Sequence, residues 1–215
     1  MLKSDGNQIL FVQDIILLPL FIMVVLLVAF IIKNTRYRNV TEAKYFIPAL
    51  VIKIIGGLAM GSVYLFYYGG GDTFYYYYDA KTFSDSIGQS FGLFLKLLFL
   101  PAKTITIDTY ESTKWLVYFN DHSGWAAAKV FGILSILTLH SYPAMTVLIA
   151  SLSFTGAWAL YRTFTDLYPK LYKQFALAIL FMPSVFFFFS GILKDSITFG
   201  CLGWMAYTAY LIFFK

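Results

Sequence analysis

Two short polar segments interrupt an otherwise apolar chain, and they hold the residue types that could carry out chemistry. The first has three glycines, 69 to 71, followed by Asp72, a run of aromatic residues and Asp79. Glycine adopts backbone conformations that other residues avoid, so this segment can direct a carboxylate from a helix end toward a cavity. The second segment places Lys194 beside Asp195 between two apolar runs. A lysine is a point charge that suits a phosphate group.

The spacing within the first segment indicates a helix face. Asp72 and Asp79 are separated by nearly two helical turns, so both carboxylates would share one face if the segment is helical. Such a pair suits a paired-carboxylate site or a divalent metal, which prefers hard oxygen ligands. Tyr75 and Tyr76 could hold a sugar ring against their flat faces and bind its hydroxyl groups.

Each of these residues also has a structural explanation. Asp72 could cap a helix by accepting from free backbone amides, and tyrosines gather at the headgroup level of membrane proteins in general. Asp195 could cap the next helix while Lys194 extends toward lipid headgroups. Against this, an ionised side chain at a bilayer edge is costly, which makes a functional role a reasonable default.

The composition is that of an integral membrane protein. Of the 215 residues, 60% are apolar and 13% are charged, against about 25% charged in a soluble domain. Because only helices and closed barrels satisfy their backbone in lipid, we expect an all-α bundle of membrane-spanning helices, and the chain shows no separate soluble domain. Five apolar runs are near the length that crosses a hydrocarbon core of about 30 Å: 15–32, 47–67, 145–161, 175–189 and 197–214.

Two shorter apolar runs, 91–100 and 126–139, lie in a long connection, 69–142. Runs of this length are typical of interfacial or re-entrant helices. The connection is therefore predicted to form a loop with interfacial helices, and the whole of 1–215 to form one membrane domain.

The net charge of +5 does not indicate nucleic-acid binding, because the basic residues lie in short loops beside the apolar runs. By the positive-inside rule, Arg36 and Arg162 mark two cytoplasmic loops. The amino terminus and the Asp72 loop are then outside, in what we expect to be a bacterial inner membrane. The same alternation places Lys194 and Asp195 on that outer face.

Other catalytic signatures are absent from the sequence. His122 and His140 are isolated and lack the spacing of metal ligands, while Cys201 lies inside an apolar run and indicates packing. The sequence has no phosphate-binding P-loop, no dinucleotide-binding fingerprint and no Gly-x-Ser-x-Gly elbow. The two polar segments therefore remain the candidates.

The order of these features resembles the GT-C superfamily of polytopic membrane glycosyltransferases, which includes protein mannosyltransferases and aminoarabinose transferases, and related polysaccharide polymerases. That family has an acid in its first outer loop, followed by aromatic residues and a small residue, as do Asp72-Thr-Phe-Tyr75-Tyr76 and Ala80 here. Interfacial helices in the same loop and a second acid in a later outer loop follow the same order. The resemblance covers about residues 45–215.

The resemblance implies transfer of a sugar from a polyprenyl-phosphate donor to an acceptor hydroxyl at the outer face. Asp72 would be the general base, and Lys194 would hold the lipid phosphate. Asp195 or Asp79 would orient the acceptor or, in metal-using relatives, bind a divalent ion. No other cofactor is implied.

Two departures from the family keep alternatives open. A helix precedes the one that leads into the Asp72 loop, and the chain ends at Lys215, where the family continues with further helices. We therefore expect the N-terminal part of such an enzyme, or partner proteins that supply the remaining helices. The alternative is a non-enzymatic membrane subunit that scaffolds a larger complex. A transporter comes third, because no inverted repeat is visible.

Overall fold

The computed structural model describes residues 3–4 and 7–215. Strands β1 (Lys3–Ser4) and β2 (Asn7–Gln8) pair in an antiparallel hairpin of two residues each. All other regular elements in the described part of the chain are helical. The all-α prediction is therefore confirmed.

Four helical segments in the described residues are long and apolar enough to cross a membrane, by length and composition alone. They are α1 (Asp14–Arg36), α7 (Tyr142–Leu167), α10 (Lys194–Phe214) and the stretch Thr41–Tyr68. That stretch joins the 3-10 turn η1 (Thr41–Tyr45), α2 (Phe46–Val63) and the π-helical turn η2 (Tyr64–Tyr68). Four of the five predicted apolar runs thus fall on these segments.

The fifth predicted run, 175–189, is not one continuous helix. After the 3-10 turn η4 (Pro169–Leu171), it is divided among α8 (Tyr172–Phe175), the π-helical turn η5 (Ala176–Leu180) and α9 (Pro183–Phe188). The break precedes Pro183, which has no N–H to donate and therefore begins a new helix readily. A membrane crossing by this segment stays a prediction.

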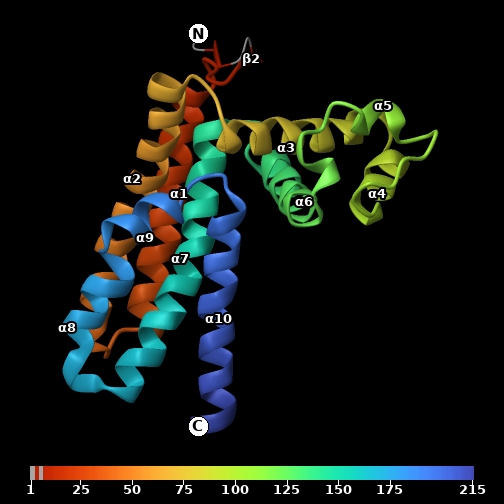
Figure 1. Cartoon of the computed structure of the whole chain (residues 1–215). Coiled ribbons are helices and arrows are strands. Elements are labelled where there is room, and N and C mark those ends of the chain that lie inside the picture. Colours follow the sequence, from red (N-terminus) through yellow and green to blue (C-terminus); the bar gives the residue numbers. More distant parts are fainter. Residues whose placement is uncertain (1–2, 5–6) are drawn as a thin grey trace.

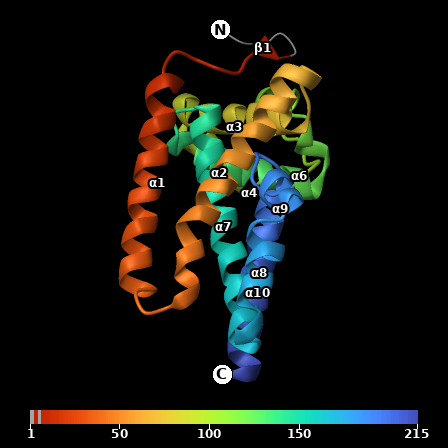
Figure 2. The same cartoon turned by 90° about the vertical axis from the view of Figure 1, so that its left-hand side faces the viewer.

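The predicted outer loop forms a head across one end of the stem made by α1, α2, α7 and α10 (Figures 1 and 2). Helix α3 (Asp72–Gln89) runs across the end of the stem, and the remaining elements of the head lie beside it. They are α4 (Phe91–Phe99), α5 (Tyr110–Thr113), the 3-10 turn η3 (Tyr118–Asn120) and α6 (His122–Leu137). None of them is among the four candidate spans.

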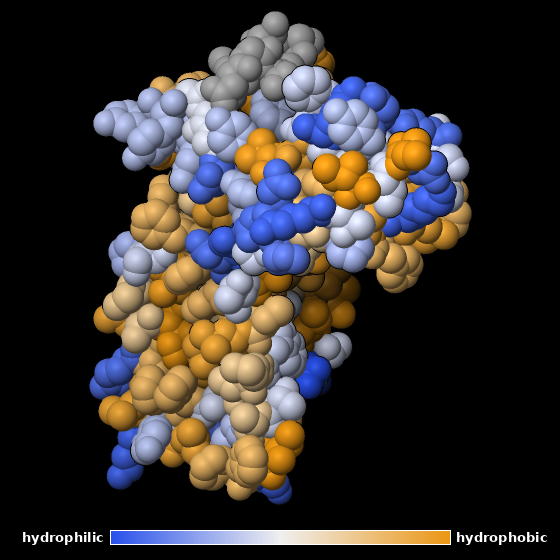
Figure 3. Space-filling view, turned by 45° about the vertical axis from the view of Figure 1, so that its right-hand side comes forward, coloured by the Kyte–Doolittle hydropathy of each residue, from blue (hydrophilic) through white to orange (hydrophobic). Residues whose placement is uncertain are grey.

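Polar and apolar residues are separated along the long axis of the molecule. Figure 3 shows most hydrophilic residues on the head, an apolar stem, and hydrophilic residues again at the far end of the stem. Within the stem, 72% of the most apolar window of α7 is buried, against 6% for α1 and 17% for α10. Helix α7 is therefore the centre of the stem, whereas α1 and α10 present apolar faces outward.

Glycines allow the close approach of α7 and α10. A Cβ added to Gly156 would lie 2.0 Å from the carbonyl oxygen of Gly200, and one added to Gly203 would lie 2.0 Å from that of Gly156. The two helices therefore touch backbone to backbone, the arrangement that small residues permit between helices in lipid.

Candidate functional site

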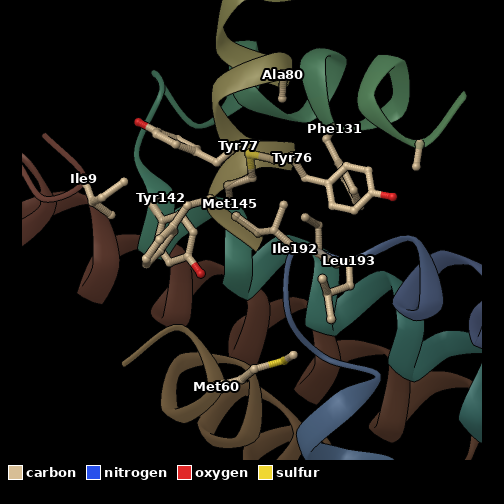
Figure 4. Close-up of a cluster of buried hydrophobic side chains, with 13 residues drawn as sticks. Ile9, Met60, Tyr76, Tyr77, Ala80, Phe131, Tyr142, Met145, Ile192 and Leu193 are labelled. Atoms are coloured by element: carbon tan, nitrogen blue, oxygen red, sulfur yellow. The ribbon is translucent and has the colours of Figure 1, made fainter. Parts of the chain in front are cut away.

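An apolar cluster holds the two polar segments side by side. It contains Tyr76 and Tyr77 from α3, Met145 from α7, and Ile192 and Leu193 from the connection just before α10 (Figure 4). Ile192 and Tyr77 are fully buried. Because Leu193 directly precedes Lys194, burial of this connection fixes the start of α10 near α3.

Two of the glycines before Asp72 adopt backbone conformations that other residues avoid. Gly69 has φ 69° and Gly71 has φ 127°, both in the region that favours glycine. A Cβ on Gly71 would also lie 2.6 Å from the ring of Tyr64. The turn therefore requires glycine, and it ends the preceding helical segment just before Asp72.

Asp72 is the first residue of α3, and the N-cap position is Gly71. The side chain of Asp72 is exposed, and its Oδ1 accepts a hydrogen bond of 3.0 Å from the phenol of Tyr118. A carboxylate in the first turn is stabilised by the helix dipole. Asp72 is thus held in place by a side chain while remaining open to solvent.

Tyr118 contacts three residues of α3, namely Asp72, Tyr76 and Asp79. Its ring stacks on Tyr76, with centroids 3.8 Å apart and planes inclined by 7°. Burial and then the charge of Asp72 raise the pKa of the Tyr118 phenol. A tyrosine hydroxyl is already protonated at neutral pH, and both causes favour that state further, so the hydroxyl acts as a donor to Asp72.

The Tyr76 phenol lies in the field of several acids. Burial is the largest cause that raises its pKa, followed by the charges of Asp121, Asp72 and Asp195. The charges of these three acids all act on a single hydroxyl group, although they come from α3, the turn before α6 and the start of α10. The fold therefore gathers them at one end of the bundle.

Asp79 has a different environment. It is buried, and its two carboxylate oxygens accept from the backbone N–H groups of Val117 and Tyr118, at 3.0 and 2.8 Å. Burial raises the pKa of Asp79 to about 6, and the two hydrogen bonds oppose that rise. Asp79 thus fastens the segment that carries Tyr118 to α3.

Lys194 and Asp195 lie in the exposed first turn of α10. The ammonium of Lys194 donates to Ser123 Oγ at 3.3 Å and lies 3.7 Å from Asp121 Oδ2. Neither Asp195 nor Ser196 caps the helix, because the N-cap is Leu193 and the Ser196 hydroxyl donates to Gly191 O at 2.7 Å. The pair is therefore available at the surface of the head.

Asp121 is the N-cap of α6. Its carboxylate accepts from the backbone N–H of Ser123 at 3.2 Å and of Gly124 at 2.9 Å. The Ser123 hydroxyl is the largest cause that lowers the pKa of Asp121, and Lys194 adds a smaller effect. An anionic Asp121 thus links α6 to the start of α10.

Of the residues that the sequence singled out, Asp72 and Tyr76 lie on α3 in the head, and Lys194 and Asp195 lie against the head at the start of α10. Asp79 is buried. Tyr75 is partly buried; successive helical residues point about 100° apart, so it projects in a different direction from Tyr76. The linking residues Tyr118, Asp121 and Ser123 were not singled out. Asp121 could have been found from a local signal, since an Asp that directly precedes a helix is a typical N-cap. The contacts of Tyr118 with Asp72, Tyr76 and Asp79 join residues that are distant in sequence.

A metal centre does not fit the described residues. No three His, Cys, Asp or Glu side chains among them come together in a way that could hold a metal ion. Asp79, the partner of Asp72 in the predicted pair, already uses both oxygens on backbone amides.

A second polar cluster surrounds His140 at the same end of the bundle. Its Nε2 lies 2.8 Å from Ser84 Oγ and 3.4 Å from Asp85 Oδ1. A nucleophile relay needs the acid on one ring nitrogen and the hydroxyl on the other. Because both partners share Nε2, this cluster is better explained as a structural contact.

The walls of the three cavities described for the chain do not include the acids of the candidate site. The first, of about 540 Å³, lies between the start of α1 and α2, and its wall includes Asp14, Phe74 and Tyr142. It reaches the first turn of α3, because Thr73 is hydrogen-bonded to Tyr142 at 2.9 Å. Asp72, Lys194 and Asp195 line none of the three.

Comparisons of the chain with protein-family models, with curated proteins and with solved structures found no match.

Proposed function

We propose that this chain forms the catalytic head of a membrane glycosyltransferase that uses a sugar linked to polyprenyl phosphate. One observation carries the proposal: an exposed carboxylate, Asp72, and an exposed cation, Lys194, are gathered with Tyr76 and Tyr118 at one end of an apolar bundle. Catalytic groups must meet at one place, and these residues come from distant parts of the chain.

We assign the roles from the charge, exposure and position of each side chain. Asp72 accepts the proton of an acceptor hydroxyl as that oxygen forms a bond to the anomeric carbon of the donor. The bond between that carbon and the phosphate oxygen breaks, and the electron pair leaves with the phosphate. Lys194 exchanges its contact with Asp121 for this phosphate, whose charge grows in the transition state. Asp195 orients the acceptor.

The lipid carrier would lie in the apolar cavity between α1 and α2. Its volume of about 540 Å³ and its mostly apolar wall suit part of an isoprenoid chain. Phe74 belongs to this wall and lies two residues after Asp72, so the cavity approaches the reactive end of α3.

The test measures the rate of sugar transfer by the full chain reconstituted in vesicles. The donors are a panel of undecaprenyl-phosphate sugars in which the sugar is radiolabelled. Asp72→Asn should lower transfer at least about 100-fold, as expected for loss of a general base. Asp108→Asn is the matched control, because Asp108 is an exposed acid of the head that pairs with Lys96 at 2.6 Å. Equal activities of the two variants would refute the assignment.

The proposal places the head outside the inner membrane of a bacterium. Basic residues at the opposite end of the stem, including Arg36 and Arg162, support this orientation. Gly88 is exposed on α3 with open space around it, so Gly88→Cys in a Cys201→Ser background provides a label site. A membrane-impermeant maleimide should label it in intact spheroplasts, and labelling only after lysis would reverse the orientation.

A non-enzymatic subunit of a larger membrane complex is the second candidate. The outward apolar faces of α1 and α10 favour it, because partner helices could cover them. Asp79 and Asp121 also have structural roles in the head. This candidate predicts that Asp72→Asn assembles normally with its partners, measured by native gel electrophoresis, and that wild-type protein transfers no sugar.

A further inference from the structure

A second site lies at the opposite end of the stem from the head. There α1 and α10, which both pack on α7, enclose a cavity of about 470 Å³. Its wall includes two arginines and four aromatic residues with a polar atom: Arg36 and Tyr37 at the end of α1, Trp158 and Arg162 on α7, and Trp204 and Tyr207 on α10. The proposed sugar transfer does not use any of them.

The charges at this cavity are unbalanced. Arg162 Nη2 donates to Asp166 at 3.0 Å, and the same carboxylate accepts from Lys215 at 3.1 Å. One negative charge is therefore paired with two positive charges. Arg36 is exposed, and none of the ion pairs among the described residues includes it. A surplus of positive charge therefore remains at the rim.

Much of the remaining wall is apolar, and the hydroxyl residues Thr35 and Thr155 also line it. Ile32, Phe46 and Phe154 line it, and the helices on either side, α1 and α10, present apolar faces outward. The indole N–H of Trp204 donates to Thr155 Oγ1 at 2.9 Å, which fixes this ring at the rim. Tryptophan and tyrosine at such a position are typical of the level of lipid headgroups.

We propose that this cavity binds one anionic phospholipid. Arg36 and Arg162 hold its phosphate, and an acyl chain lies along the apolar wall between α1 and α10. Arginine suits this contact because its planar group offers several donors to phosphate oxygens, and Arg162 retains donors beyond the nitrogen bonded to Asp166. A partner helix would not need two cations at one end of an apolar groove, whereas a phospholipid has the matching charge.

The test is native mass spectrometry of the full chain in detergent, titrated with dioleoylphosphatidylglycerol or dioleoylphosphatidylcholine. We expect the anionic lipid to bind about tenfold more tightly than the zwitterionic lipid, and Arg36→Gln to remove most of that preference. Arg38→Gln is the matched control, because Arg38 is exposed nearby and does not line the cavity. It should leave the preference unchanged. Glycerol phosphate tests a soluble source and should not compete at the same concentration.

Three outcomes would overturn the proposal. Equal binding of the two lipids would show that the site does not select a net negative headgroup, because both lipids carry a phosphate. Equal losses in Arg36→Gln and Arg38→Gln would reduce the effect to general attraction of charge. Competition by glycerol phosphate at the lipid's own concentration would make this a soluble-phosphate site. A dimer of the chain that forms only without bound lipid, and is weakened by Arg36→Gln, would assign the groove to a second copy.

Discussion

The parallel stack of Tyr76 on Tyr118, with ring centroids 3.8 Å apart, joins α3 to the turn before α6. Tyr118 also connects two acids of α3, because its backbone N–H donates to buried Asp79 and its phenol donates to exposed Asp72. The two acids thus share a helix face, as their spacing predicts, but they meet through a tyrosine and have different roles. Asp79 positions Tyr118, and Tyr118 positions Asp72.

Removal of one oxygen tests this relationship. Tyr118→Phe keeps the stacked ring and the backbone contact with Asp79 but loses the hydrogen bond to Asp72. Because this bond lies at the exposed surface, its loss should lower the melting temperature only slightly. Sugar transfer should fall at least about tenfold, since the general base is no longer held in position. Tyr76→Phe alters the partner ring and should have a smaller effect. Equal losses would mean that the phenol of Tyr118 has no special role in positioning Asp72.

The buried carboxylate of Asp79 predicts a pH dependence of stability. Its pKa is raised from 3.8 to about 6 in the folded chain. The folded state therefore holds this proton more tightly, and the stabilisation is fully present below pH 3.8 and lost as the pH rises through 6. A displacement of about two pH units corresponds to roughly 3 kcal/mol. The melting temperature of wild-type protein in detergent should fall between pH 4 and pH 7.

Asp79→Asn is the comparison for that measurement, since asparagine cannot titrate. At pH 4 the wild-type side chain is a neutral carboxylic acid, whose hydroxyl oxygen can still accept weakly from a backbone N–H, whereas the amide nitrogen of asparagine cannot. The variant should therefore be less stable than wild type at pH 4. The gap should narrow toward pH 7, where the wild-type carboxylate is ionised and buried. Parallel melting curves across this range would show that Asp79 does not titrate there.

The parts of the fold that could be predicted depend on local features. Spanning length and hydropathy belong to the run itself, so four apolar runs fall on four long helical segments. The placement of Lys194 and Asp72 at the same end follows from the alternation of helices. The interruption before Pro183 could not be predicted from hydropathy. It arises because proline lacks the backbone N–H that a continuous helix needs.

The candidate site was less predictable than the fold, because the residues that contact one another there are distant in sequence. Nothing near Asp79 indicates that backbone amides of Val117 and Tyr118 will occupy its carboxylate, so its seven-residue spacing from Asp72 suggested a paired site. Asp121 was visible as a polar residue of the loop, but its contact with Lys194 arises only when α6 and α10 pack together.

Because α7 and α10 touch backbone to backbone, we predict that adding a single methyl group at Gly156 lowers the stability of the protein. Gly156→Ala would place its Cβ 2.0 Å from the backbone oxygen of Gly200, and backbone cannot move away as a flexible side chain can. We expect a clear fall in melting temperature, on the scale of about 1–3 kcal/mol for overpacking. Gly88→Ala is the control: Gly88 lies in α3 with nothing within 4 Å, so alanine there should be neutral or stabilising by up to about 1 kcal/mol. Similar melting temperatures for both variants would contradict the close approach.

Lys53 of α2 and Ser153 of α7 donate to the same carbonyl oxygen, so we predict that substitutions of these two residues have coupled effects on stability. Lys53 is buried, and its ammonium donates to the carbonyl of Phe189 at 2.9 Å, while Ser153 of α7 donates to the same oxygen at 2.8 Å. In Lys53→Met or Ser153→Ala alone, this carbonyl keeps one donor. In the double variant it keeps neither, and a buried carbonyl without a partner costs about 1–3 kcal/mol.

The double variant should therefore lose more stability than the two single variants together, by about 1 kcal/mol or more. Thermal unfolding of the four proteins in one detergent measures this coupling directly. Ser151→Ala in place of Ser153→Ala provides the control, because the Ser151 hydroxyl donates within its own helix to Val147 O. It should show no coupling to Lys53→Met. Additive losses for Lys53 and Ser153 would mean that the Phe189 carbonyl is satisfied in another way, so that the connection between α9 and α10 does not depend on these two donors.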